Sequence, residues 1–497
     1  MRENFDGDLE MKLKELFSNI YGINIIGDEN EEIKGIAYHS KKVKEGYLFA
    51  ALKGQQTDGN KYVIEAVNRG AKAILSEESP PSNFPITWIK VEEPRKVLAL
   101  ISSKFYGFPS KKINVIGITG TNGKTSITYI LENIFLSAGF SPGIIGTINY
   151  RYCEKEYSSS LTTPEAPDLQ RILKEMRDNG VSYCFMEVSS HSLKLDRVLG
   201  IDFKAGVFTN LSGDHLDFHQ NMEEYYQAKK RLFLPDNNNM KAIINIDDPW
   251  GERLRKEISI GFVSYGFRAE ADIKVEKYRL SEKGIEALIN TPQGDIEIYS
   301  TLLGKPYLYN ILASIGVSLI FNVPIEKIKE GVSNIKQIPG RMEKIENKLG
   351  INVIVDYAHS DDSLKNLLET VNQIKKGKVI LVFGAGGDRD RSKRPRMGAV
   401  AGKLSDFSII TSDNPRSEDP VKIIEEIEEG FKKINKRNYL IISDRKEAIK
   451  EAINMANKGD WVLIAGKGHE NYQIIGDKII PFNDKEVALQ FLKERNG

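Results

Sequence analysis

The chain has 497 residues, of which 40% are hydrophobic and 28% charged, enough for about three globular domains with a core in each. Seventy basic residues against sixty-nine acidic ones give a net charge of +1, which argues against bulk attraction to nucleic acid or anionic lipid. The only cysteines, Cys153 and Cys184, are too few for a disulfide framework or a thiolate metal site. The N-terminus is charged and no apolar run approaches the roughly 20 residues of a membrane span, so we expect a cytoplasmic protein without membrane insertion.

The first part of the chain, residues 1–108, predicts a small mixed α/β domain. Residues 46–52 are apolar and typical of a strand, and residues 62–69 predict a helix ahead of another apolar segment. Residues 108–112, Phe-Pro-Ser-Lys-Lys, have the composition of a linker. We therefore expect a domain boundary near residue 108.

A glycine-rich turn follows this linker. Residues 113–119 are apolar and β-branched, as in a buried parallel strand, and apolar residues recur at helical spacing over 127–135. Between them the chain reads Gly-Ile-Thr-Gly-Thr-Asn-Gly-Lys-Thr at 117–125. A glycine-rich turn between a strand and a helix, ending in a Lys-Thr pair, is typical of a nucleoside triphosphate site.

The chemistry of such a site assigns a role to each part of the turn. Backbone N–H groups around Gly120, Thr121, Asn122 and Gly123 can surround phosphates, because glycine lets the backbone approach closely. Lys124 can reach the β- and γ-phosphates, and the Thr125 hydroxyl can bind Mg²⁺. Ile118 stands where the strict pattern has a glycine, which indicates a variant class of loop. The alternative is a tight turn with no ligand.

Three further strands are expected at 182–188, 205–210 and 241–246, each ending in polar residues. Because ligands bind outside the carboxyl ends of parallel strands, these polar residues are expected to face the same nucleotide. Glu187 ends an apolar strand, where a bare carboxylate is unfavourable, so we interpret it as a Mg²⁺ ligand, with a surface position as the alternative. His215, within 214–217, could bind metal or phosphate, or be an ordinary hydrogen-bonded loop residue. Zinc is disfavoured because nothing supplies a third ligand.

Strands and helices alternate regularly from about residue 339 to the end, which predicts a doubly wound, Rossmann-like α/β domain. The expected strands lie at 353–355, 379–383, 407–410, 439–442 and 461–464. Charged loops follow two of these strands, at 384–391 and 413–416. Two arginines, an Asp-Asn pair and Glu470 suit a zwitterionic amino acid. A phosphate site is the alternative, which the acidic residues disfavour.

Taken together, these motifs resemble the Mur ligases. The residues that carry the resemblance are 119–125, 187–191, 214–217, 245–248, 356–359 and 413–416, and it covers essentially the whole chain in the order of the family. It implies three α/β domains: 1–108 for a UDP-sugar, 109–338, with a mostly parallel sheet, for ATP, and 339–497 for an amino acid. It also implies an ATP-dependent ligase of peptidoglycan synthesis.

The reaction implied by the resemblance begins when the D-glutamate γ-carboxylate of UDP-MurNAc-L-Ala-D-Glu attacks the ATP γ-phosphate. The acyl phosphate is then captured by the amine of meso-2,6-diaminopimelate, giving an amide. ATP and Mg²⁺ are the implied cofactors, the partners are these small molecules, and a monomer is expected.

The resemblance also assigns site residues. Lys229 matches a carbamylated lysine that helps to hold Mg²⁺ with Thr125 and Glu187, and Lys124, Glu187, His215 and Lys229 form the implied catalytic set. The nucleotide contacts include Asn310, Arg341 and Asp356. The implied contacts to the UDP-sugar peptide are Tyr38, Ser40, Gln55, Gln56, Thr57, Thr162, Thr163, Ser189 and Arg197.

The choice of amino acid depends on Asp413, Asn414, Pro415 and Arg416, which are similar to the form found in ligases that add diaminopimelate. Arg416 can pair with the distal carboxylate that diaminopimelate has and lysine lacks, and an unpaired buried arginine would penalise lysine. The remaining implied contacts to the amino acid are Arg389, Gly466 and Glu470.

The chain departs from the family pattern in three places. The Asp-Ser-Arg of the first domain is His39-Ser40-Lys41, a glutamine is Leu195, and a Phe-Asn pair is Pro306-Tyr307. Other readings are a ligase that adds lysine or another diamine, a folylpolyglutamate synthase-like ligase, and a nucleotide-dependent switch protein. A nucleotide-dependent switch protein would have no use for the predicted amino-acid site.

Overall fold

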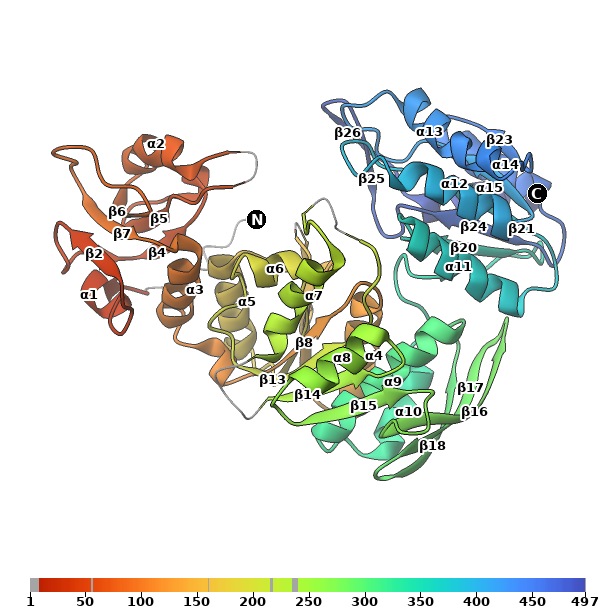
Figure 1. Ribbon diagram of the computed structural model, residues 1–497, viewed down its shortest axis with the longest axis horizontal. Coiled ribbons are helices and arrows are strands. Elements are labelled where there is room, and N and C mark those ends of the chain that lie inside the picture. Colours follow the sequence, from red (N-terminus) through yellow and green to blue (C-terminus); the bar gives the residue numbers. More distant parts are fainter. Residues whose placement is uncertain (1–8, 55–56, 160, 215–217, 235–239, 497) are drawn as a thin grey trace. The chain divides into compact units, whose positions relative to one another are not determined.

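The computed structural model describes residues 9–54, 57–159, 161–214, 218–234 and 240–496 (Figure 1). One compact unit comprises 1–119, 140–206 and 228–240, and the other comprises 120–139, 207–227 and 241–497. Three larger sheets, of five, eleven and six strands, confirm the expected α/β fold with three domains. The exact boundaries near residues 108 and 338 stay a prediction.

The first sheet lies within residues 23–91. Its strands, in spatial order, are β2 (Ile23–Ile26), β7 (Thr87–Val91), β6 (Ala71–Ser76), β5 (Tyr47–Ala50) and β4 (Gly35–Ala37). β2 is antiparallel to β7 and the other pairs are parallel. Around it lie β1 (Met11–Lys12), β3 (Glu32–Ile33), α1 (Leu13–Leu16), α2 (Val63–Asn68) and α3 (Pro94–Phe105). The expected strand at 46–52 and helix at 62–69 are thus confirmed as β5 and α2.

The segment 108–112 is more than a linker. It contains a 3-10 turn at Pro109–Lys111, preceded by Phe108 in a left-handed backbone conformation. Ser110 is buried, and its hydroxyl accepts a hydrogen bond from the backbone N–H of Asp202 at 3.0 Å. The composition of 108–112 gave no sign of this packing, because the partner lies far along the chain.

The second sheet carries the phosphate loop. Its spatial order is β11 (Lys155–Ser158), β10 (Asn149–Tyr152), β9 (Pro142–Ile145), β12 (Tyr183–Glu187), β8 (Asn114–Thr119), β13 (Phe203–Phe208), β14 (Lys241–Asn245), β15 (Phe262–Gly266), β16 (Ile273–Ser281), β17 (Gly284–Thr291) and β18 (Gly294–Ser300). The pairs β9–β12, β12–β8, β14–β15 and β15–β16 are parallel. β10, β11, β17 and β18 add antiparallel edges that the sequence interpretation did not include.

The helices of this region begin and end as follows: α4 (Lys124–Ser137), α5 (Ala166–Asp178), α6 (Ser190–Lys194), α7 (Met222–Lys230), α8 (Pro249–Glu257), α9 (Lys305–Ile320) and α10 (Ile325–Asn334). α4 and α9 are apolar over most of their length and largely buried. α4 packs against α9 and against α10, and Gly331 of α10 lies against the backbone of Ile134 in α4.

The third sheet is the predicted doubly wound sheet. Its order is β19 (Glu343–Ile345), β20 (Asn352–Asp356), β24 (Trp461–Ala465), β21 (Val379–Phe383), β22 (Phe407–Ile410) and β23 (Tyr439–Ile441), parallel except for β19. Its helices are α11 (Asp361–Ile374), α12 (Lys393–Leu404), α13 (Pro420–Lys433), α14 (Arg445–Met455) and α15 (Asp484–Asn496). A separate hairpin joins β25 (Tyr472–Ile475) to β26 (Lys478–Pro481).

Two hydrophobic cores lie on opposite faces of this third sheet. Along β21, Leu381 and Phe383 belong to one core, whereas Ile380 and Val382 belong to the other. Because successive strand residues point to opposite faces, this alternation means that helices cover both sides. α11, α12 and α13 cover one face, and α14 and α15 the other. The loops at the carboxyl edge are then left to bind ligands.

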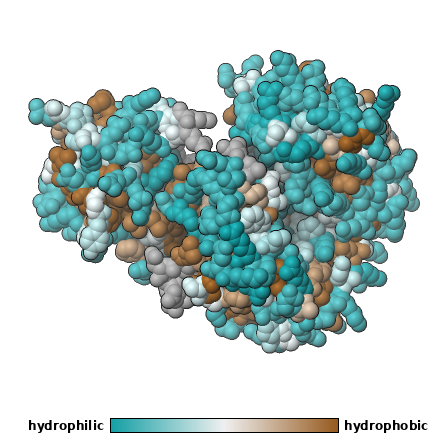
Figure 2. Space-filling model, in the orientation of Figure 1, coloured by the Kyte–Doolittle hydropathy of each residue, from teal (hydrophilic) through white to brown (hydrophobic). Residues whose placement is uncertain are grey.

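The face of the molecule shown in Figure 2 is largely polar. Hydrophilic residues predominate on it, and hydrophobic residues form small separate groups. Over the described ranges, no helix is both long and apolar enough to cross a bilayer.

Candidate functional site

The phosphate loop has the close backbone packing that its glycines predicted. Gly120 has a φ of 145°, and a Cβ atom there would lie 1.8 Å from the Thr209 hydroxyl oxygen. Gly123 has a φ of 91°, and a Cβ atom would lie 2.5 Å from the Asn310 Oδ1 atom. Only glycine fits both positions. The turn therefore brings Asn310, a predicted nucleotide contact, directly against the loop.

Lys124 lies over this loop. Its ammonium donates to the carbonyl oxygens of Gly120 at 2.8 Å and Thr121 at 2.9 Å. α4 begins at Lys124, so the positive end of the helix dipole points at the same place. A cation and a helix N-terminus at one turn make a site for an anion such as a phosphate chain.

The segment after β13 holds the loop in shape. The Thr121 and Asn122 N–H groups donate to the carbonyl and side-chain oxygens of Asn210, at 2.9 and 3.0 Å. The Thr209 hydroxyl donates to the Asn122 carbonyl at 2.7 Å. These contacts confirm that the polar residues ending the strand expected at 205–210 lie at the phosphate loop.

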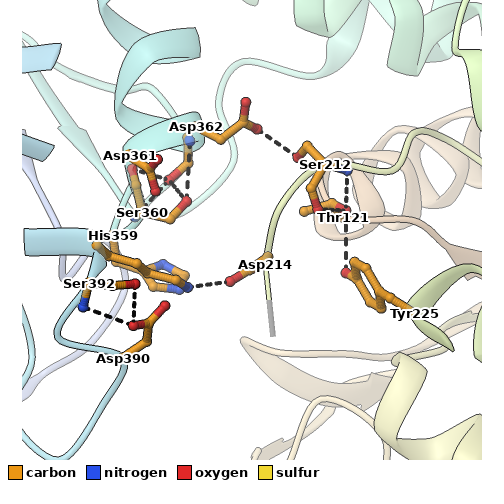
Figure 3. A network of polar contacts seen from close by, with 12 residues as sticks. Thr121, Ser212, Asp214, Tyr225, His359, Ser360, Asp361, Asp362, Asp390 and Ser392 are labelled. Carbon is orange, nitrogen blue, oxygen red and sulfur yellow. Dashed lines mark hydrogen bonds and ion pairs between the residues drawn. The ribbon is translucent and has the colours of Figure 1, made fainter. Parts of the chain in front are cut away.

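A polar network also links the loop to α11 (Figure 3). The Asp362 carboxylate accepts hydrogen bonds from the Asn122 amide at 3.3 Å and from the Ser212 hydroxyl at 2.7 Å. Nearby, Lys393 at the start of α12 pairs with Asp214 at 2.6 Å. The sequence interpretation missed Asp362, Ser212 and Lys393, since no local pattern links residues so far apart in the chain.

Arg341, a predicted nucleotide contact, lies beside the loop, and Asp356, another predicted contact, lies within reach of the Arg341 charge. An Arg341 guanidinium N–H donates to the Thr125 hydroxyl at 3.3 Å, and the guanidinium lies 4.5 Å from the centre of the Tyr357 ring. The Asp356 carboxylate accepts from the Met342 and Ala358 N–H groups at 2.7 and 2.8 Å. Burial raises the Asp356 pKa, and the Arg341 charge opposes that shift. A buried carboxylate with a free acceptor position can accept a hydrogen bond from a ribose or a base.

Glu187 belongs to the other compact unit, and it is buried at 1% exposure. Its carboxylate accepts from the Thr147 N–H at 2.8 Å and the Thr147 hydroxyl at 3.0 Å. These donors replace part of its lost hydration, so the surface alternative for Glu187 is wrong. In β12 it is the register partner of Ile118, which precedes the phosphate loop in the chain. Thr147 was not predicted.

Four of the predicted UDP-sugar contacts lie together in the unit that contains Glu187. The Thr163 hydroxyl donates to the Glu187 carbonyl at 2.8 Å and accepts from the Ser189 N–H at 3.1 Å. Arg197 donates to the Thr163 carbonyl at 3.3 Å, and the Thr162 hydroxyl lies 3.1 Å from that of Thr147. The arrangement brings hydroxyls and a guanidinium together, and the guanidinium also pairs with Glu165 at 2.9 Å. An acidic peptide would bind there beside or in place of the Glu165 carboxylate.

The predicted UDP-sugar contacts of the first domain differ in whether their side chains are already hydrogen-bonded within the protein and in whether the structure describes them. The Tyr38 hydroxyl donates to Asp168 at 2.6 Å. Ser40 is buried and donates to Glu65 at 3.0 Å, so its hydroxyl is already occupied. The Thr57 hydroxyl donates to that of Tyr62 at 3.3 Å. Gln55, Gln56 and His215 lie outside the described residues.

Lys229 lies near the end of α7 with 1% exposure. A lysine is almost never fully buried unless it is paired or has a specific role. The resemblance-based assignment of a carbamate therefore fits the burial.

The loops of the third sheet bring the predicted amino-acid contacts together. Arg416 donates to the Gly387 carbonyl at 2.7 Å, and a Cβ atom at Gly386 would lie 2.9 Å from the Arg416 Nη1 atom. Gly387 also packs on the Pro415 carbonyl, which a side chain there would strike at 1.9 Å. The loops holding Arg389 and Arg416 are thus packed on each other.

Glu470 meets Asn414 at the same edge of the sheet. The Asn414 amide donates to one Glu470 oxygen at 2.9 Å, and fully buried Lys467 donates to the same oxygen at 3.0 Å. Gly466 lies beside Asp413, because a Cβ atom there would be 2.5 Å from the Asp413 Oδ2 atom. A guanidinium and a carboxylate at one site suit a ligand with both charges. Lys467 was missed, although it stands inside the Gly466–Glu470 motif.

Arg394 supports the loop that carries Arg389. It is 1% exposed and donates to Glu418, Glu426 and the Gly386 carbonyl. Glu418 in turn accepts from the Asp388 N–H at 2.6 Å. The Arg394 hydrogen bonds lower the pKa of Glu418 from 4.5 to about 2.

We expect a Glu418→Gln variant to lose stability relative to the parent above pH 4.5, where the Glu418 carboxylate is ionised in both folded and unfolded states. The difference should shrink as the pH falls from 4.5 towards about 2, because the parent then loses the same ion pair. Urea unfolding across this range would measure it. Glu429→Gln is the control, since Glu429 lies 3.8 Å from Lys433 and both are well exposed. A difference that did not depend on pH would contradict the assignment.

Three comparisons with known proteins bear on this site. Models described as Mur ligase family, catalytic domain, Mur ligase middle domain, and Mur ligase, glutamate ligase domain match residues 32–106, 118–318 and 340–468. UDP-N-acetylmuramoyl-L-alanyl-D-glutamate--2,6-diaminopimelate ligases of Clostridium acetobutylicum and Clostridioides difficile are 44% and 46% identical to this chain, over 97% of it and 100% of each relative. A solved structure with that enzyme name is 30% identical, with a TM-score of 0.69 over 98% of this chain and 99% of the other.

Proposed function

Because the chain belongs to the Mur ligase family, we propose that it uses ATP to join meso-diaminopimelate to the D-glutamate of UDP-MurNAc-L-Ala-D-Glu. The observation that carries this proposal is the packing of the Arg416 loop against Gly386 and Gly387, with Glu470 at the same sheet edge. Arg416 would bind the distal carboxylate and Glu470 the distal ammonium of the amino acid. The cytoplasmic location and the monomeric state stay predictions.

The proposed reaction has two steps, phosphoryl transfer at the phosphate loop and amide formation with the amino acid held by the loops of the third sheet. The γ-carboxylate of the peptide would attack the ATP γ-phosphorus, ADP would leave, and an acyl phosphate would form. The amine of diaminopimelate would then attack the acyl carbon, phosphate would leave, and the amine would lose a proton. Lys124, at the turn where α4 begins, would offset negative charge on the transferring phosphoryl group.

The residues present also fit Mg²⁺. No group of three His, Cys, Asp or Glu side chains that could hold a metal occurs among the described residues, but Mg²⁺ needs only one or two carboxylates beside phosphates and water. The family resemblance assigns Thr125, Glu187 and a Lys229 carbamate as its ligands, and each offers the oxygen donor that Mg²⁺ prefers. When bound, the ion would neutralise phosphate charge.

Lys229 offers a separate test. We expect the parent protein in ¹³C-bicarbonate to give a carbamate carbonyl signal in its ¹³C NMR spectrum, and Lys229→Ala to abolish that signal, because Lys229 is the buried lysine that matches the carbamylated lysine of the family. Lys230→Ala is the matched control from the same helix and should keep the signal. A parent spectrum without the signal, or a signal that survives in Lys229→Ala, would contradict the carbamate.

The experiment that tests the function is release of phosphate from ATP with UDP-MurNAc-L-Ala-D-Glu and Mg²⁺. Reactions with meso-diaminopimelate, with L-lysine and with no amino acid are compared. We expect release to depend on diaminopimelate. A preference for lysine would keep the ligase and overturn the role of Arg416. Release that no amino acid affects, with nucleotide bound, would favour a switch protein instead.

A further inference from the structure

A fully buried ion pair lies beneath the candidate amino-acid site. Arg445 at the start of α14 and Asp484 at the start of α15 are both 0% exposed at their side chains. The guanidinium donates twice to the carboxylate, from Nε to Oδ1 and from Nη2 to Oδ2, each at 2.8 Å. This bidentate geometry fixes the plane of the guanidinium.

The same guanidinium contacts the backbone just ahead of two site loops. It donates to the Ala465 carbonyl at 2.9 Å and to the Ser412 carbonyl at 3.4 Å. Ala465 directly precedes Gly466, and Ser412 directly precedes Asp413. The Arg445 side chain thus binds the residue that precedes each of two segments, Asp413 to Arg416 and Gly466 to Glu470.

A contribution to folding stability is a weak explanation for the presence of this buried ion pair. Two charges removed from water lose hydration, and apolar residues of similar volume often stabilise a core equally well. The neighbouring core is apolar: Ile449, Ile453 and Phe491 on the same two helices are buried in it. What apolar side chains could not supply is a planar group that holds two backbone carbonyls at a fixed separation.

We propose that Arg445 and Asp484 are positioning residues for the amino-acid site. This inference rests on the proposed function. The pair sets the separation between the loop of Asp413 to Arg416 and the loop of Gly466 to Glu470. It acts through backbone carbonyls and has no contact with the amino acid itself. Arg445, held by Asp484, would therefore govern how tightly diaminopimelate is bound and leave the nucleotide site unaffected.

The decisive variant is Arg445→Met with Asp484→Leu, which removes both charges together and keeps the local net charge. We expect this protein to fold with a Tm near that of the parent, because apolar residues replace the buried pair. The KM for diaminopimelate should rise on the order of 10- to 100-fold, as expected for a small displacement of binding groups. The KM for ATP should not change.

Two further proteins complete the test. Arg279→Met with Glu286→Leu removes an exposed ion pair between β16 and β17 and should leave both KM values unchanged. Arg445→Lys keeps the positive charge but not the planar fork, so it should give an intermediate KM for diaminopimelate. If the double variant does not fold, Arg445→Lys alone tests the positioning role.

An unchanged KM for diaminopimelate in the folded variants would overturn the positioning role and leave a purely structural one. A parent enzyme without amino-acid-dependent phosphate release would instead overturn the proposed function. The two failures are distinguishable, because only the second is visible in the parent.

Discussion

Replacing Lys124 with alanine is expected to lower kcat for amino-acid-dependent phosphate release on the order of 10²- to 10³-fold. Its ammonium lies on the carbonyls of Gly120 and Thr121, at the N-terminus of α4, where a phosphate chain would be held. No other lysine lies at this turn in the chain, and the Arg341 guanidinium contacts a different part of the turn, the Thr125 hydroxyl, so we expect a large but incomplete loss. Initial rates of phosphate release would measure the effect, and circular dichroism would verify the fold.

Lys112→Ala is the matched control for Lys124→Ala. Lys112 is exposed and lies just before β8, so its removal changes the net charge equally without touching the loop. We expect its kcat to equal that of the parent. An equal loss in both variants would assign the effect to net charge, and no loss in Lys124→Ala would overturn the phosphate site.

Arg416→Asn is expected to lower kcat/KM for diaminopimelate on the order of 10²-fold, close to 2.7 kcal/mol, and to leave kcat/KM for L-lysine unchanged or higher. The guanidinium would pair with the distal carboxylate, which only diaminopimelate has. Asparagine is chosen because Arg416 has a φ of 52°, a left-handed conformation that asparagine tolerates better than most residues. Competition between the two amino acids, with both products quantified, gives the ratio directly.

Arg437→Asn is the control for the arginine substitution. Arg437 is exposed and lies beyond α13 in the chain, away from the loops of the site. It should keep the selectivity of the parent. Arg416→Asn could instead lose activity towards both amino acids equally. The main role of Arg416 would then be to hold the loop through its hydrogen bond to Gly387, and its assignment as the residue that selects diaminopimelate would be wrong.

Much of the candidate site could be predicted because its signals are local. The glycines of 117–125 stand between a strand and a helix, so their conformation follows from neighbouring residues. The strands at 379–383 and 407–410 have the predicted bounds, because runs of apolar residues bounded by loops define buried parallel strands. Their order in the sheet then places the following loops at one edge.

What the sequence did not predict depends on partners distant in the chain. Asn122 contacts Asp362, and Arg445 contacts Asp484, across separations that no periodic pattern reports. The strands β16 and β18 carry many exposed residues, so their apolar signal is weak. Lys229 lacked any local sign of burial, because the groups that cover it come from the tertiary fold.

The most direct test of the account uses UDP-MurNAc-L-Ala-D-Glu labelled with ¹⁸O in the γ-carboxylate, ATP, Mg²⁺, and equal diaminopimelate and L-lysine. Mass spectrometry of the products reports both the amide formed and the label in the released phosphate. The account predicts a product that contains diaminopimelate and a phosphate that carries one ¹⁸O atom from the carboxylate. A lysine product, or phosphate without the label, would contradict it.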